Sequence, residues 1–184
     1  FSYAKNQAVY VPVPADRAAA TALVAHFRPL LENPATLKVG QNIKYDLLVL
    51  GNYGVQVKGP MFDTMIAHYV LQPELRHNMD FLANIYLNYE PIPIEDLIGP
   101  KGKGQLNMRD LSPEQVYRYA CEDADVTLQL KKPLEEELEQ NNAKALFEEI
   151  EMPLVPVLAY MERNGVRIDT EALKETSRHF TLRM

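Results

Sequence analysis

The longest stretch of regular hydrophobic spacing lies in residues 112–141, where apolar side chains recur every three or four positions, as on one face of a helix. Ser112 followed by Gln115 forms a capping box, and Pro113 suits the first helical turn, so we predict that the helix begins near Pro113. Pro133 is expected to kink or break it. The apolar face carries Val116, Ala120, Ala124, Thr127 and Leu130.

Three acidic residues lie near the middle of this helix. Tyr119 and Asp123 fall on its apolar side, whereas Glu122 and Asp125 point roughly the other way. Asp123 alone is therefore expected to face the interior, where an unpaired carboxylate is costly unless it meets a cation or a metal ion. A partly buried Asp that bonds to a helix cap or to an arginine would produce the same pattern.

Shorter patterns predict an α/β fold along the rest of the chain. The runs that resemble strands are a hairpin over residues 1–13, a strand over residues 36–39, a strand that ends at residues 62–64, and residues 166–168. Helical stripes follow Asp16, Asn42, Asp63 and Asp80, and one covers residues 146–162 with irregularity at Pro153 and Pro156. A last helix follows, capped by Asp169 or Thr170.

A second acid recurs in an apolar setting. Asp46 lies between Ile43 and Leu47 on the helix that follows residues 36–39, at the carboxyl end of a strand, where α/β folds bind ligands. Pairing of Asp46 with Lys44 or Arg76, or a peripheral position, would also account for it. Asp63 directly precedes a helix and is interpreted as its N-cap.

Composition and charge exclude several classes of protein. The 184 residues are 47% hydrophobic, and the apolar runs are far too short to span a bilayer, so we expect a cytoplasmic protein without membrane contact. One cysteine, Cys121, excludes an internal disulfide framework and a cysteine-based zinc site. The net charge of −6 does not indicate nucleic-acid binding, although a site built from carboxylates would itself be acidic.

Two basic stretches could contact phosphate. Residues 76–80 (RHNMD) place a cation and polar groups at the start of a helix, which suits phosphate binding. His77 is more simply a hydrogen-bonding group than a metal ligand. Residues 101–104 (KGKG) form a basic loop that either contacts a nucleic-acid backbone or is a solvated turn.

Four motifs together resemble the proofreading exonuclease domain of bacterial DNA polymerase I. They are residues 39–46 (VGQNIKYD), 62–64 (FDT), 76–80 (RHNMD) and 119–125 (YACEDAD), in matching order and spacing. Residues 149–158 and 163–169 resemble the join to the polymerase domain. The resemblance implies a 3′-5′ exonuclease domain over residues 1–142 and a helical connection to the start of the polymerase domain over residues 143–184.

The resemblance also implies a ribonuclease H-like three-layer α/β fold and removal of mispaired 3′ nucleotides of DNA by two divalent metal ions, Mg²⁺ or Mn²⁺. Asp46 and Asp123 match metal-binding catalytic carboxylates, and Tyr119 matches the residue that orients the attacking water. Three further residues match those that hold the single-stranded 3′ end: Gln41, Asn42 and Arg76. Ile94 stands where some relatives have an aromatic residue, which weakens the case for base stacking there.

The chain departs from the family at its first motif, because no Asp-x-Glu precedes Tyr3. We therefore expect an N-terminally truncated fold that lacks its central first strand and shows no appreciable exonuclease activity. The hairpin and the strand at residues 36–39 would then be unpaired edges that close on each other or pair with a neighbouring molecule. The pKa of Asp123 is expected to rise through burial and through proximity to Asp46.

Two other functions remain open from the sequence. One is an inert exonuclease-like domain that positions DNA or braces the polymerase, against which the joint presence of Asp46, Tyr119 and Asp123 argues. The other is an RNA exonuclease similar to ribonuclease D, which shares the asparagine-aspartate and tyrosine-aspartate motifs but not the polymerase-like tail.

Overall fold

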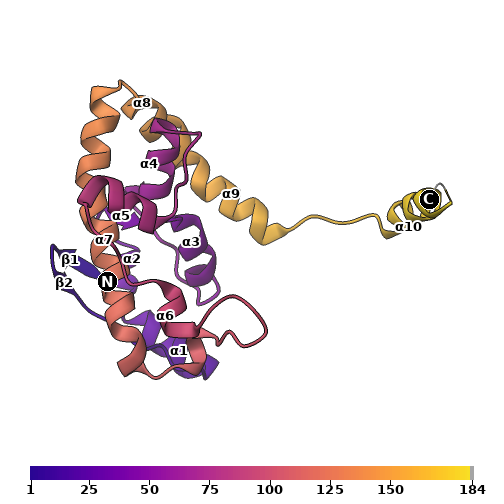
Figure 1. Ribbon diagram of the computed structural model, residues 1–184, viewed down its shortest axis with the longest axis horizontal. Helices are drawn as coiled ribbons and strands as arrows, with labels where there is room; N and C mark the ends of the chain where they lie inside the picture. Colours follow the sequence, from indigo (N-terminus) through magenta and orange to yellow (C-terminus); the bar gives the residue numbers. More distant parts are fainter. Residues whose placement is uncertain (183–184) are drawn as a thin grey trace.

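The computed structural model describes residues 1–182, and its longest element is helix α7, Pro113–Gln140. This helix runs along one side of the body and packs against three strands and four other helices (Figure 1). The capping box of Ser112 and Gln115 and the position of Pro113 are confirmed. The predicted break at Pro133 is wrong: the helix continues, because Leu130 and Leu134, each 0% exposed, anchor it in the core on both sides of the proline.

The strands are short and form two separate pairs. Strand β1, Ser2–Ala4, pairs antiparallel with β2, Gln7–Ala8. Strand β3, Lys38–Gly40, pairs in parallel with β4, Met61–Asp63. The order of strands and helices confirms an α/β chain. The hairpin is shorter than predicted, because residues 9–13 have no partner strand among residues 1–182 beyond the Phe1–Val9 backbone pair.

Of the two alternatives for the hairpin and β3, closure on each other is wrong for this chain, and pairing with a neighbouring molecule stays a prediction. Within residues 1–182, β1 and β2 form no ladder with β3 or β4. Both pairs instead contact α7, which lies against β1, β2 and β3. The helix therefore holds the two pairs at separate places along its length.

The main core lies where α4, Thr64–Leu71, and α5, Met79–Leu87, pack on α7. Its buried members from these helices are Ala67, Leu82, Ala83, Val126, Leu130, Leu134 and Leu138. Helix α3, Ile43–Gly51, follows β3 and adds Ile43 to the same core. The predicted apolar stripes of these helices thus face one common interior.

A smaller core supports the other end of the body. Helix α1, Arg17–Ala25, begins at the predicted cap Asp16, whose side chain accepts a hydrogen bond from the Ala19 amide. The short α2, Arg28–Leu31, follows it. Val24, Leu31 and Val55 are buried together there. Two short elements were not predicted: α6, Ile94–Ile98, and a 3₁₀ turn, Met108–Asp110.

The C-terminal part first packs on the body and then leaves it. Helix α8, Lys144–Leu146, continues through a π-helical turn, Phe147–Glu151, into α9, Met152–Asn164. The irregularity thus lies before Pro153 rather than at the two prolines, and α9 continues through Pro156. Phe147, Met152 and Val155 join the main core.

Helix α10, Thr170–Thr181, is capped by Asp169 as predicted and lies away from the body (Figure 1). The predicted strand at residues 166–168 is wrong: Val166 and Ile168 are 90% and 62% exposed, and no strand in the described part of the chain lies beside them to pair with. None of the helices described is both long and apolar enough to cross a membrane.

Candidate active site

The site is framed by Asp63, at the end of β4. Its carboxylate is fully buried and accepts hydrogen bonds from the Met65 and Ile66 amides, at 2.9 and 3.2 Å, which confirms the predicted N-cap of α4. It also accepts bonds from the Asn42 and Ile43 amides, at 3.2 and 2.7 Å. One carboxylate therefore fixes the start of α4 and the turn from β3 into α3. This second role was not predicted.

Asp46 lies on the first turn of α3, directly after the turn that the Asp63 carboxylate holds. Its side chain is exposed rather than packed among the apolar residues, whereas Ile43 on the same helix is buried. Desolvation by neighbouring protein atoms, together with the charge of Asp63, raises the pKa of Asp46 to about 6. Pairing with Lys44 is not observed, because the Lys44 ammonium bonds to Glu162 of α9.

Asp123 and Tyr119 lie one turn apart on α7, as predicted. Both are half-buried, and the Asp123 Oδ1 atom is buried without a hydrogen-bond partner among the described residues. Burial raises the pKa of Asp123 to about 6, hydrogen bonding with Tyr119 lowers it, and Glu122 and Asp80 raise it further. Burial and the charge of Asp123 raise the pKa of Tyr119 to about 12, so its hydroxyl keeps its proton at neutral pH.

The acid that acts on this pair from another helix is Asp80, on the first turn of α5, and its role was missed from the sequence. Its charge raises the pKa of both Tyr119 and Asp123. The predicted rise in the pKa of Asp123 is confirmed, but the predicted cause is half wrong: burial acts first, and the acidic neighbours are Glu122 and Asp80 rather than Asp46. Helical phase identifies a shared face within one helix, but it cannot place α5 against α7.

Asp46 and Asp123 have different acidic neighbours, which are Asp63 for Asp46 and Glu122 and Asp80 for Asp123. Strand β3, which leads into the turn before Asp46, packs on α7, which carries Asp123. Among residues 1–182, no group of three or more His, Cys, Asp or Glu side chains is arranged to hold a metal ion. The unpartnered Oδ1 of Asp123 is suited to a cation, and Mg²⁺ bound there would complete its octahedral oxygen shell largely with water.

The three predicted DNA-binding residues differ in exposure and in whether their side chains already make hydrogen bonds. The Gln41 amide nitrogen donates to the His77 carbonyl at 2.7 Å, and its oxygen accepts from the Thr64 hydroxyl. Asn42 is exposed in a left-handed conformation, with φ of 60°. Arg76 is exposed, and its guanidinium makes no hydrogen bond or ion pair with any residue that the structure describes. Arg76 is therefore available to an anionic ligand.

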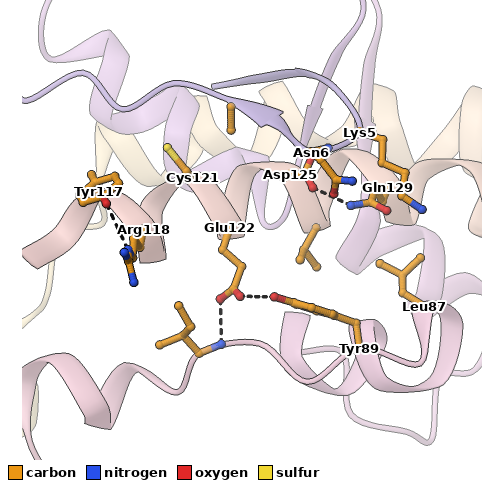
Figure 2. Close-up of a pocket in the computed structure, with 13 residues that line it drawn as sticks. Lys5, Asn6, Leu87, Tyr89, Tyr117, Arg118, Cys121, Glu122, Asp125 and Gln129 are labelled. Carbon is orange, nitrogen blue, oxygen red and sulfur yellow. Dashed lines mark hydrogen bonds between the residues drawn. The ribbon is translucent and has the colours of Figure 1, made fainter.

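Asp125 lies on the opposite face of α7, and the prediction that it points away from the interior is wrong. Asp125 is 9% exposed and is the most buried of the three acids. It lies beside Asn6 and Gln129 (Figure 2). Its Oδ1 atom accepts hydrogen bonds from the Asn6 amide at 2.8 Å and the Ser2 hydroxyl at 3.1 Å, and its Oδ2 atom accepts one from Gln129 at 2.6 Å. Asp125 was predicted to point away from the interior, but the hairpin covers it.

Glu122, on the same face as Asp125, also holds a distant segment. Its carboxylate accepts hydrogen bonds from the Tyr89 hydroxyl and from the Ile92 amide, the latter at 2.8 Å (Figure 2). Glu122 and Asp125 therefore attach other parts of the chain to α7, while Tyr119 and Asp123 remain the candidates for chemistry.

Comparison with known proteins gives a family match over most of the chain. A family model described as 3′-5′ exonuclease matches residues 1–139. DNA polymerase I of Pseudomonas aeruginosa is 42% identical over 195 residues, which cover 100% of this chain and 21% of that protein. DNA polymerase I of Rhizobium leguminosarum is 39% identical over 151 residues, which cover 82% of this chain and 15% of that protein. The chain thus spans about a fifth or less of these relatives.

Solved structures share the fold. The structure described as the POL domain of Pol1 from M. smegmatis in complex with DNA primer-template and dNTP superposes with a TM-score of 0.68 at 24% identity, over 93% of this chain and 25% of that one. A structure described as the apo form of the nuclease gives a TM-score of 0.62 at 20% identity, over 78% of this chain and 68% of that one. The α/β arrangement therefore fits a ribonuclease H-like exonuclease fold.

Proposed function

The chain belongs to the 3′-5′ exonuclease family, as the exonuclease domain of a bacterial DNA polymerase I, and from this premise we propose that it serves proofreading. In this role the domain removes a mispaired nucleotide from the single-stranded 3′ end of DNA. The observation that carries the proposal is the Asp123 carboxylate, which has a raised pKa, a buried Oδ1 atom without a partner, and Tyr119 one turn away. A buried, unsatisfied carboxylate oxygen is suited to a metal ion.

Asp46 and Asp123 are proposed as two of the carboxylates that hold divalent metal ions, Mg²⁺ or Mn²⁺, in the parent protein. A metal pair of this kind activates water and stabilises the attacking and leaving oxygens of an in-line displacement. Among the described residues, no group of three or more His, Cys, Asp or Glu side chains is arranged to hold such a metal pair. We propose that this chain alone has no appreciable exonuclease activity, because its 184 residues contain no Asp-x-Glu before Tyr3 and so lack the first motif of the family.

The protein groups have distinct proposed roles. Tyr119 keeps its proton at neutral pH and can donate a hydrogen bond to the scissile phosphate or orient a water beside it. Arg76 is the cation that meets the DNA backbone, since its guanidinium is exposed. Gln41 and Asn42 lie at the turn before α3 and bind the terminal nucleotide.

Residues 143–184 are proposed to connect this domain to the polymerase domain. The curated relatives are several times longer than this chain, and one solved structure of the same fold is described as a POL domain bound to DNA primer-template. An RNA exonuclease similar to ribonuclease D is not favoured, because the relatives are DNA polymerases I. An inert domain that only positions DNA is not favoured either, since Asp46, Tyr119 and Asp123 are all present.

The first test uses the purified 184-residue chain with end-labelled single-stranded DNA and RNA in Mg²⁺ or Mn²⁺. We expect no appreciable digestion of either substrate, because the ligand set among the described side chains is incomplete. Metal-dependent digestion by this chain would refute its proposed inactivity.

The second test uses the longer parent protein. Asp123→Ala should lower its 3′-5′ exonuclease rate by more than about 100-fold, since even the outer partners of metal ligands cost about 10- to 100-fold. Glu136→Gln, an exposed change on the same helix, is the matched control and should leave the rate unchanged. Polymerase activity measures folding in both variants. Equal exonuclease rates in the two variants would overturn the assignment of Asp123.

A further inference from the structure

A buried pair of histidines lies outside the candidate active site. His68 of α4 is 0% exposed, and its Nδ1 atom lies 2.7 Å from the Nδ1 atom of His77, in the segment between α4 and α5. The two rings meet edge to face, with centroids 4.9 Å apart. Phe81 and Tyr86 of α5 pack on His68 in the same manner, at 6.0 and 5.8 Å. The proposed function so far uses neither histidine.

His77 connects this pair to the proposed DNA-binding residues. It follows Arg76 directly, and its backbone carbonyl accepts the hydrogen bond from Gln41 at 2.7 Å. Residues 72–76 are exposed, so His77 is the first half-buried residue after α4 ends. The contact between the rings therefore fixes the position of the backbone at His77, and with it the position of Arg76 relative to Gln41.

The distance between the rings requires particular protonation states. Two Nδ1 atoms at 2.7 Å need one N–H donor and one lone pair, so the two rings cannot both carry a proton on Nδ1. The Nε2 atom of His68 is buried without a partner among the described residues, so a proton added there would have no acceptor from them. Burial lowers the pKa of His68, and His77 lowers it further.

Glu137 of α7 is the acid that opposes these shifts, and its carboxylate accepts a hydrogen bond from Tyr86 at 2.6 Å. Tyr69 of α4 faces the His77 ring, with centroids 5.5 Å apart. His68 is accordingly a neutral ring at neutral pH, held within an aromatic cluster.

We propose that His68 is a positioning residue for DNA binding: through the ring of His77 it holds Arg76 and Gln41 in one fixed arrangement. The part of this inference that concerns DNA rests on the proposed function, in which Arg76 binds the DNA backbone. The placement of the segment by His68 does not depend on it. The two parts therefore need separate measurements.

The first measurement involves no DNA. The chain contains four histidines, and His26 and His179 are exposed and serve as reference rings. Long-range ¹H–¹⁵N spectra at pH 8 should show complementary neutral tautomers for His68 and His77, with one Nδ1 protonated and the other not. In His68→Phe the amides of residues 75–78 should exchange with solvent faster, whereas His179→Phe should leave them unchanged. Unchanged exchange in His68→Phe would overturn the positioning role.

The second measurement is the dissociation constant for a fluorescent oligo(dT) at pH 8 in EDTA, taken from anisotropy. His68→Phe and Arg76→Ala should each weaken binding about fivefold, and the double variant should bind no more weakly than Arg76→Ala alone, because one acts through the other. His68→Asn keeps a polar atom near the Nδ1 position and should restore most of the affinity. Circular dichroism confirms that each variant is folded.

The outcomes separate the two hypotheses. Losses that add in the double variant would overturn the positioning role of His68, even if every variant binds DNA. If the unmodified chain does not bind oligo(dT), the proposed DNA-binding role fails, and the exchange rates of residues 75–78 alone decide whether His68 places the segment.

Discussion

Asp123 has a carboxylate whose ionisation opposes folding. Its pKa is raised from 3.8 to about 6, chiefly by burial, so between these values the folded chain binds more protons than the unfolded chain. Stability therefore falls as the pH rises through this window, and above it the charged, half-buried group destabilises the fold. A residue that costs stability when it is charged is typical of a functional site rather than of packing.

Replacement of Asp123 by a neutral residue should show how much its ionised carboxylate destabilises the fold. Asp123→Asn is expected to stabilise the chain at pH 8 by about 1 kcal/mol, after allowance for partial solvent access. The gain should shrink below pH 6 and vanish by pH 4, where Asp123 is itself protonated. Urea unfolding at pH 8, 6 and 4, followed by circular dichroism, measures it. Glu136→Gln, exposed on the same helix, is the control, and an equal gain at pH 4 would contradict the origin in ionisation.

At the scale of elements, α7 connects parts of the chain that have few other contacts. Asp125 attaches the hairpin, Glu122 attaches the segment around Tyr89, and the buried leucines attach α4 and α5. Because the hairpin does not pair with β3, its position depends on α7. Polar side chains on the face that was predicted to point away from the interior thus take part in tertiary structure.

Asp125→Ala tests this attachment. It removes the acceptor of the Asn6 amide and one of the three acceptors of the Ser2 hydroxyl, and it should lower the free energy of unfolding by about 1–3 kcal/mol. Asp125→Asn is the matched variant, because its amide oxygen can still accept both bonds, and it should retain most of the stability. Urea denaturation measures both, and the exchange rate of the Asn6 amide reports the hairpin itself. Similar losses in the two variants would show that charge, rather than an acceptor, is what the hairpin requires.

At the scale of the whole molecule, the body extends to the end of α9, while α10 lies apart from it (Figure 1). Phe147, Met152 and Val155 are core residues although they lie beyond the family match, which ends at residue 139. In α10 no residue is buried. Stability should therefore depend on residues up to Asn164 and hardly at all on the residues after it.

Two shortened chains test this expectation. A chain that ends at Gly165 should keep its melting temperature within about 2 °C, since it loses no buried side chain of the described residues. A chain that ends at Asn142 loses four buried apolar side chains, of which Phe147, Met152 and Val155 contribute about 2–5 kcal/mol each, and should show no cooperative thermal transition. Calorimetry measures both. A large drop in melting temperature for the longer of the two would mean that α10 packs on the body in solution.

The sequence by itself determined the features that depend on neighbours a few residues away. The capping box at Ser112, the caps at Asp16 and Asp63, and the shared face of Tyr119 and Asp123 follow from helical spacing and local hydrogen bonds, and the structure has each of them. The family motifs have the same local character, because each is a short run of neighbouring residues, and the exonuclease resemblance is therefore recognisable from the sequence alone.

Only the tertiary structure decided which distant groups meet. Asp125 is buried because Ser2 and Asn6, 123 and 119 residues away, fold over it, and helical phase contains no information about such a cover. The same holds for Asp80 beside Asp123 and for His68 against His77, whose positions depend on how α4 and α5 pack on α7. Spacing along the chain fixes the face of a helix on which a side chain lies, but packing between helices fixes what that face touches.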